Sequence, residues 1–124
     1  MFLFAWTALS GWTAALLLAA GITIPYLAAR PRKLAPHYWV GFLIVGAALF
    51  HAYVPMSEGR ISGYDQAGLW LATGALLLMF WQAGLGLALR ASAGLARISA
   101  RKTHFWTMLG IVVLVAAHVA RNRP

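Results

Sequence analysis

The sequence predicts an all-α integral membrane protein, a single four-helix bundle over residues 1–124 built from two similar helix pairs. Hydrophobic residues make up 62% of the chain and only two of its 124 residues are acidic, which excludes an ordinary soluble domain. Apolar segments recur four times at close to the length of about 20 residues that a helix needs to cross a bilayer. They are Leu3–Ala28, His37–Val54, Ala67–Leu89 and Phe105–Ala120. Helices are expected because unpaired backbone groups are costly in lipid.

The first apolar segment is expected to remain in the chain as a helix. Met1–Ala28 has no basic n-region, and its apolar stretch is longer than that of a signal peptide. Pro25 is expected to kink the end of this helix.

Prolines predict the limits of the second helix. Pro36 fits its first turn, where the missing N–H costs nothing, and Pro55 is expected to end it. The residues that follow, Ser57–Tyr64, predict a short polar loop.

The approach to the fourth helix has a different composition. Arg90–Thr103 alternates small apolar residues with Arg and Ser. This pattern predicts either a helix lying at the membrane interface or a tight connection.

Basic residues predict the orientation of the bundle. Seven of the ten fall in the first and third loops: Arg30, Arg32, Lys33, Arg90, Arg97, Arg101 and Lys102. The positive-inside rule therefore places these two loops in the cytoplasm and both termini outside, in a bacterial-type inner membrane. Arg121 and Arg123 at the tail run against this asymmetry.

All four histidines of the chain lie in two apolar segments with one repeated spacing. His37 and His51 are fourteen positions apart, as are His104 and His118. Fourteen helical residues rise roughly 21 Å and return to within about 40° of the same face. Each helix therefore offers two imidazoles on one side at two depths, an arrangement suited to two stacked haems.

An internal repeat relates these two segments. A shift of 67 positions places His37-Tyr38-Trp39 on His104-Phe105-Trp106, Ile44 on Ile111, and His51 on His118. Both segments follow cytoplasmic loops and so run in the same direction. His37 and His104 are therefore expected to bind one haem on the cytoplasmic side, and His51 and His118 a second on the outer side.

An imidazole on each side fills both axial positions of haem iron, which suits electron transfer. Each histidine must be neutral, binding through Nε2 while Nδ1–H is held by an acceptor. On a helix that acceptor is often a backbone carbonyl one turn earlier or a nearby hydroxyl. Thr103 and Thr107 are available near His104, but the sequence does not assign the acceptors.

Small and basic residues add weaker candidates for haem contact. Glycines at the expected depths on the other two helices allow close approach of a flat ring: Gly11, Gly21, Gly74 and Gly84. Ordinary packing of membrane helices explains the same glycines. Arg30 and Arg101 are candidates to pair with haem propionates, although topology alone also accounts for them. Tyr38, Trp39 and Trp106 fit an interfacial aromatic belt.

The histidines also have a purely structural interpretation. A histidine in a membrane helix can form a hydrogen bond to a neighbouring helix, which is worth about 0.6 kcal/mol on average.

The absence of cysteine excludes thiolate-bound iron–sulfur clusters and covalent haem within this chain. The net charge of +8 does not indicate nucleic-acid binding, because the basic residues flank apolar segments instead of forming a stripe.

With these histidine pairs, nearly the whole chain resembles the di-haem membrane cytochrome b superfamily, including the amino-terminal core of cytochrome b and ferric-reductase-like transmembrane domains. The resemblance implies two non-covalent b-type haems, with ligand roles for His37, His51, His104 and His118 only. The chain lacks the Pro-Glu-Trp-Tyr motif of quinol oxidation and any flavin or nicotinamide domain.

The leading hypothesis is therefore a di-haem electron-transfer subunit of an oxidoreductase, passing electrons across the bilayer between a quinone or redox partner and a second partner. One alternative is a stand-alone oxidoreductase acting on quinone or superoxide. Its candidate pocket residues are Tyr26, Ser57, Tyr64 and Gln82. The other alternative is a haem-free structural subunit of a membrane complex.

Overall fold

The computed structural model describes residues 2–27, 35–57, 59 and 65–122. They form α1 (Phe2–Leu27), α2 (Ala35–Ser57), α3 (Gln66–Ala91) and α4 (Gly94–Arg121). Each helix is long and apolar enough to cross a membrane. The predicted all-α membrane fold is therefore confirmed.

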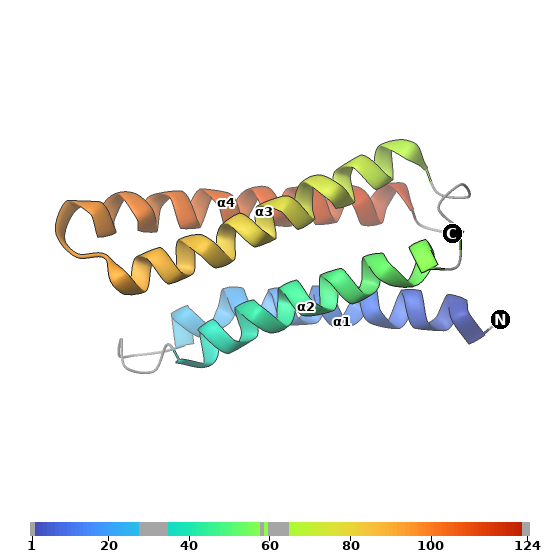
Figure 1. Cartoon of the computed structure of the whole chain (residues 1–124), viewed down its shortest axis with the longest axis horizontal. Coiled ribbons are helices and arrows are strands. Elements are labelled where there is room, and N and C mark those ends of the chain that lie inside the picture. Colours follow the sequence, from blue (N-terminus) through green and yellow to red (C-terminus); the bar gives the residue numbers. More distant parts are fainter. Residues whose placement is uncertain (1, 28–34, 58, 60–64, 123–124) are drawn as a thin grey trace. The chain divides into compact units, whose positions relative to one another are not determined.

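The four helices make two compact hairpins (Figure 1). In the first hairpin α1 packs along α2, and in the second α3 packs along α4. Each hairpin has its own seam of buried side chains between its two helices. Ile44 and Val54 are buried in the first, and Ala75, Met79 and Ile111 in the second. Assembly of both hairpins into one bundle stays a prediction.

Apolar side chains dominate the surface of both hairpins. Leu16 in α1, Trp39 in α2 and Trp70 in α3 are each about 70% exposed, at 71%, 72% and 69%. Large side chains of this kind on every helix would be costly in water and are stable in lipid. The small buried seams are consistent with this, since lipid supplies the apolar surroundings that a soluble domain must supply from its own core.

The helix ends agree with the sequence in part. Pro36 is the second residue of α2, as predicted. The prediction that Pro55 ends α2 is wrong, because the helix continues to Ser57. Proline removes only the bond from its own nitrogen to the carbonyl four residues earlier, and one such loss close to a helix end does not stop the remaining turn.

A two-residue connection, Ser92-Ala93, joins α3 to α4. Residues 94–103 are the first turns of α4, so the tight connection is much shorter than the segment expected for it. Gly94 has a φ of +58°, a backbone conformation that favours glycine. The resulting 28-residue α4 is roughly 42 Å long, longer than the apolar part of a bilayer.

Candidate functional site

The histidines of α2 and α4 lie on heptad seams that face the preceding helix of each hairpin. His37, Ile44 and His51 are seven residues apart, and His104, Ile111 and His118 repeat this spacing. A seven-residue repeat keeps one helix face against a partner helix. Ile44 is 8% exposed and Ile111 is 2% exposed, and all four histidines are half-buried.

His37 is bound to the carbonyl of Gly21 in α1. Its Nδ1 atom lies 2.9 Å from the Gly21 oxygen. In a regular helix that oxygen would accept the N–H of residue 25, but Pro25 has none. The imidazole therefore satisfies a carbonyl that the proline has left without its helical donor.

His51 makes the corresponding contact near the other end of the first hairpin. Its Nδ1 atom lies 3.0 Å from the carbonyl oxygen of Thr7 and 3.3 Å from the hydroxyl of Ser10. Ser10 is only 8% exposed and donates its own hydroxyl proton to the Thr7 oxygen. Gly11 lies directly against the ring, since a Cβ there would be 2.9 Å from Cε1 of His51.

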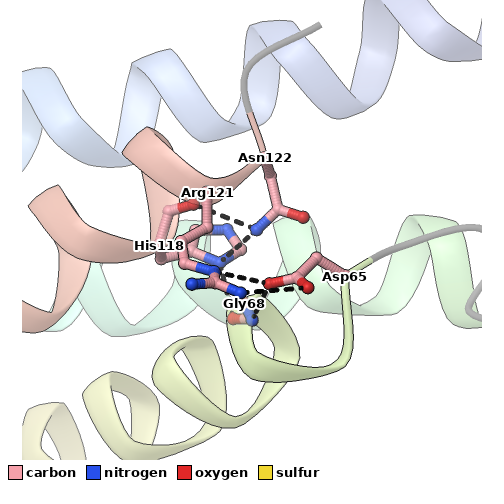
Figure 2. A network of polar contacts seen from close by, with 5 residues as sticks. All are labelled: Asp65, Gly68, His118, Arg121 and Asn122. Atoms are coloured by element: carbon pink, nitrogen blue, oxygen red, sulfur yellow. Dashed lines mark hydrogen bonds and ion pairs between the residues drawn. The ribbon is translucent and has the colours of Figure 1, made fainter.

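His118 belongs to a polar network at one end of the second hairpin (Figure 2). Its Nδ1 atom lies 2.9 Å from the carbonyl oxygen of Gly68. The Asn122 amide donates to the His118 carbonyl at 3.0 Å, and its nitrogen is 3.2 Å from Nδ1. Asp65 caps α3 by accepting the Gly68 N–H at 2.8 Å. Gly68 is thus held on both of its backbone polar groups.

Arg121 closes this network from α4. Its Nε donates to Oδ2 of Asp65 at 2.8 Å and its Nη2 to Oδ1 at 3.3 Å. The Arg121 guanidinium and the Gly68 N–H lower the pKa of the Asp65 carboxyl below its ordinary value. One carboxylate therefore joins the start of α3 to the end of α4.

His104 contacts a side chain of α3, that of Gln82, where the other three histidines contact a backbone carbonyl of the preceding helix. The Gln82 amide nitrogen donates to the His104 carbonyl at 3.0 Å. A Cβ on Gly86 would lie 3.9 Å from Cε1 of His104, so the ring lies over the turn after Gln82. The Nδ1 atom of His104 is buried.

The carbonyl contacts fix the chemistry of three rings. A carbonyl oxygen only accepts, so the bound Nδ1 atoms of His37, His51 and His118 carry the proton. In a neutral imidazole the lone pair is then on Nε2. A nitrogen lone pair on a ring oriented by a carbonyl is the usual state of a histidine that ligates a metal.

The sequence left the source of these carbonyls unassigned for the same three histidines. They come from the preceding helix of the hairpin, not from one turn earlier on the histidine's own helix. The Thr103 hydroxyl donates to the Ser99 carbonyl of its own helix. Three residues in these contacts were not predicted from the sequence: Ser10, Asp65 and Asn122. The short polar segment around the start of α3 could have identified Asp65.

The four candidate glycines separate into two groups. Gly11 lies against His51, and Gly21 supplies the carbonyl for His37. A Cβ on Gly74 would touch only Leu114, at 3.5 Å, and one on Gly84 would meet nothing within 4 Å.

The other candidates are dispersed. Arg101 is exposed on α4, and Arg30 lies outside the described residues, as does Tyr64. Tyr26 is 75% exposed, and Ser57 donates to the Val54 carbonyl of its own helix.

Neither hairpin makes a two-histidine site by itself, since its two histidines are about 21 Å apart along one helix. Within the described ranges, no three His, Cys, Asp or Glu side chains gather as a metal site. Comparison of the chain with protein-family models, with curated proteins and with solved structures finds no match.

Proposed function

We propose that this chain is a di-haem b-type membrane cytochrome that serves as an electron-transfer subunit of an oxidoreductase. The observation that supports the proposal is the shared orientation of three rings. The Nδ1 atoms of His37, His51 and His118 each bond to a backbone carbonyl of the preceding helix, which leaves Nε2 as the basic atom.

In this proposal His37 and His104 would hold one haem on the cytoplasmic side, and His51 and His118 would hold the outer one. The carbonyl bonds hold the rings in one orientation, and a ligand ring held in advance loses less entropy on binding. Haem, when bound, would supply a one-electron carrier.

The surroundings of the protein follow from the same proposal. The chain lies in a bacterial-type inner membrane with its termini outside and loops one and three in the cytoplasm, as the basic residues indicate. Its partners are redox proteins or subunits of a membrane complex, with quinone as a candidate donor or acceptor.

The test is a reduced-minus-oxidised spectrum of the purified protein with pyridine haemochrome quantification. The expected result is two b-type haems per chain. No haem, after expression with an adequate haem supply, would overturn the proposal.

A second candidate function, a haem-free structural subunit, is favoured by the same hydrogen bonds. They join the two helices of each hairpin, which is what a purely structural histidine does in a membrane. The two candidates differ in which ring nitrogen matters. The Nδ1 bonds are the ones that join the helices in the structural candidate, whereas ligation needs Nε2.

The variants His51→Asn and His51→Leu separate these functions. The Asn amide can donate from a position close to that of Nδ1, but it has no atom at the Nε2 position. The cytochrome proposal predicts that both variants lose the outer haem, while His51→Asn unfolds at a temperature close to that of the wild type. The structural candidate predicts a colourless protein throughout, destabilised only in His51→Leu.

A further inference from the structure

The hairpins share one register of histidine contacts, and this register points to a position for His104. In the first hairpin, His37 and His51 contact Gly21 and Thr7, which are fourteen residues apart like the histidines themselves. In the second hairpin, His118 contacts Gly68. The residue fourteen positions beyond Gly68 is Gln82.

Gln82 does lie against His104. Its amide nitrogen donates to the His104 carbonyl at 3.0 Å. The ring contacts that follow one turn later also correspond. Gly11 lies four residues after Thr7 and lies against His51, while Gly86 lies four residues after Gln82 and a Cβ there would be 3.9 Å from Cε1 of His104. The α3 helix thus presents Gln82 to His104 as α1 presents Thr7 to His51.

The Gln82 amide has an unused acceptor at this place. Its Oε1 atom is buried and has no hydrogen bond within the part of the chain that the structure describes. A buried polar atom left unbonded is destabilising, and lipid offers it no water. The Nδ1 atom of His104 is buried on the same helix–helix seam.

We propose that Gln82 is the positioning residue for His104, accepting its Nδ1–H through Oε1 after a small rotation of the amide. His104 then takes the same tautomer as the other three histidines, with its lone pair on Nε2. Its orientation depends on a replaceable side chain, whereas the other three depend on backbone carbonyls. The value of this orientation for ligation rests on the proposed function, but the hydrogen bond itself does not.

The test uses nitrogen–proton correlation spectra of the imidazoles in the full-length protein, prepared without haem in detergent micelles. These spectra distinguish Nδ1–H from Nε2–H tautomers for each histidine. The wild type is expected to show all four histidines as Nδ1–H. Gln82→Met has nearly the same size but lacks the amide oxygen, so it is expected to convert His104 alone to Nε2–H.

Two further variants make the result decisive. Gln82→Glu retains an acceptor oxygen and is expected to keep the Nδ1–H signal of His104. Gln66→Met makes the same replacement at an exposed site on α3 and is expected to change no tautomer. The signals of His37, His51 and His118 report whether each variant is folded.

An Nε2–H signal for His104 in the wild type, or an unchanged His104 signal in folded Gln82→Met, would overturn the inference. If Gln82→Met fails to fold, the wild-type and Gln82→Glu spectra still decide, because both must show Nδ1–H. None of these spectra requires haem. A protein that shows the Gln82-dependent tautomer but never binds haem would therefore refute the proposed function and leave this inference standing.

Discussion

The Nδ1 atom of His37 lies 2.9 Å from the carbonyl oxygen of Gly21, the oxygen that Pro25 leaves without its helical N–H donor. A proline inside a membrane helix is tolerated when a neighbouring helix satisfies the freed carbonyl. Here the neighbour is α2, and the donor is a candidate haem ligand. The proline in α1 and the histidine in α2 are therefore parts of one interaction.

Restoring the helical donor is expected to weaken this interaction. Pro25→Ala supplies an N–H that competes with His37 for the Gly21 oxygen. The imidazole Nδ1–H signal of His37 is expected to move towards the position of a weaker hydrogen bond, while that of His51 stays unchanged. Nitrogen–proton correlation spectra in micelles measure both.

Pro36→Ala is the matched control for this change. Pro36 lies in the first turn of α2, where no helical carbonyl loses a partner, so neither histidine signal should move. An equal effect of both substitutions on His37 would contradict the role assigned to Pro25.

The histidine seam could be predicted from the sequence because spacing alone determines which residues share a helix face. The shift of 67 positions correctly related α2 to α4, and it places Ile44 and Ile111 at equivalent buried positions. The presence of four helices could also be predicted, since apolar runs of membrane length have few alternatives, but α4 begins at Gly94, eleven residues before the predicted Phe105.

The partners of the histidines could not be predicted in this way. Every helical residue has a carbonyl, and the one that meets a given ring depends on the register of the hairpin. Thr7 corresponds to Gly68, a shift of 61 instead of 67, because Gly68 and His118 are 50 positions apart in the second hairpin, whereas Thr7 and His51 are 44 apart in the first. Gly74 and Gly84, predicted from their depth along the helix, therefore lie off this register.

Gly11 is expected to be intolerant of a side chain. In Gly11→Ala the added Cβ would lie 2.9 Å from Cε1 and 3.2 Å from Nδ1 of His51, so the ring must move away from Thr7. Overpacking of this kind costs about 1–3 kcal/mol. We expect a lower unfolding temperature and, if haem is bound, loss of the outer haem with retention of the other.

Gly84→Ala provides the comparison. A Cβ there meets nothing within 4 Å, and replacing a mid-helix glycine by alanine stabilises a helix by about 0.5–1 kcal/mol. Unfolding temperature and haem content should be unchanged or slightly higher. A loss of haem in Gly84→Ala alone would instead support the prediction that Gly84 contacts haem.

Asp65 is expected to make stability depend on acid pH. Its pKa in the folded protein is lowered below the ordinary value of 3.8 by Arg121 and the Gly68 N–H. The ionised carboxyl therefore stabilises the fold fully above about pH 4, and this contribution disappears as the pH falls through the lowered pKa. The unfolding temperatures of wild type and Asp65→Asn should differ slightly at pH 7 and become equal below the lowered pKa of Asp65.

Asparagine is also a good N-cap, so Asp65→Asn removes the charge while keeping an acceptor for Gly68. The double variant with Arg121→Gln should be no less stable than Asp65→Asn alone, because the ion pair is already lost. A difference between wild type and Asp65→Asn that persists unchanged below the lowered pKa would show that charge is not the cause.

Gly68 and Asn122 are expected to form a size-coupled pair. A Cβ on Gly68 would collide with the amide of Asn122, so Gly68→Ala must displace that amide from the His118 carbonyl, at a cost of about 1–3 kcal/mol. Asn122→Ala loses the same hydrogen bond, worth about 0.5–1.5 kcal/mol, but creates space beside Gly68. The double variant should therefore be more stable than the sum of the two single effects predicts, because the added methyl group then has room.

Unfolding free energies of the four proteins in detergent measure this coupling. Strictly additive losses would show that the substituted Gly68 is destabilising for a reason other than its contact with Asn122.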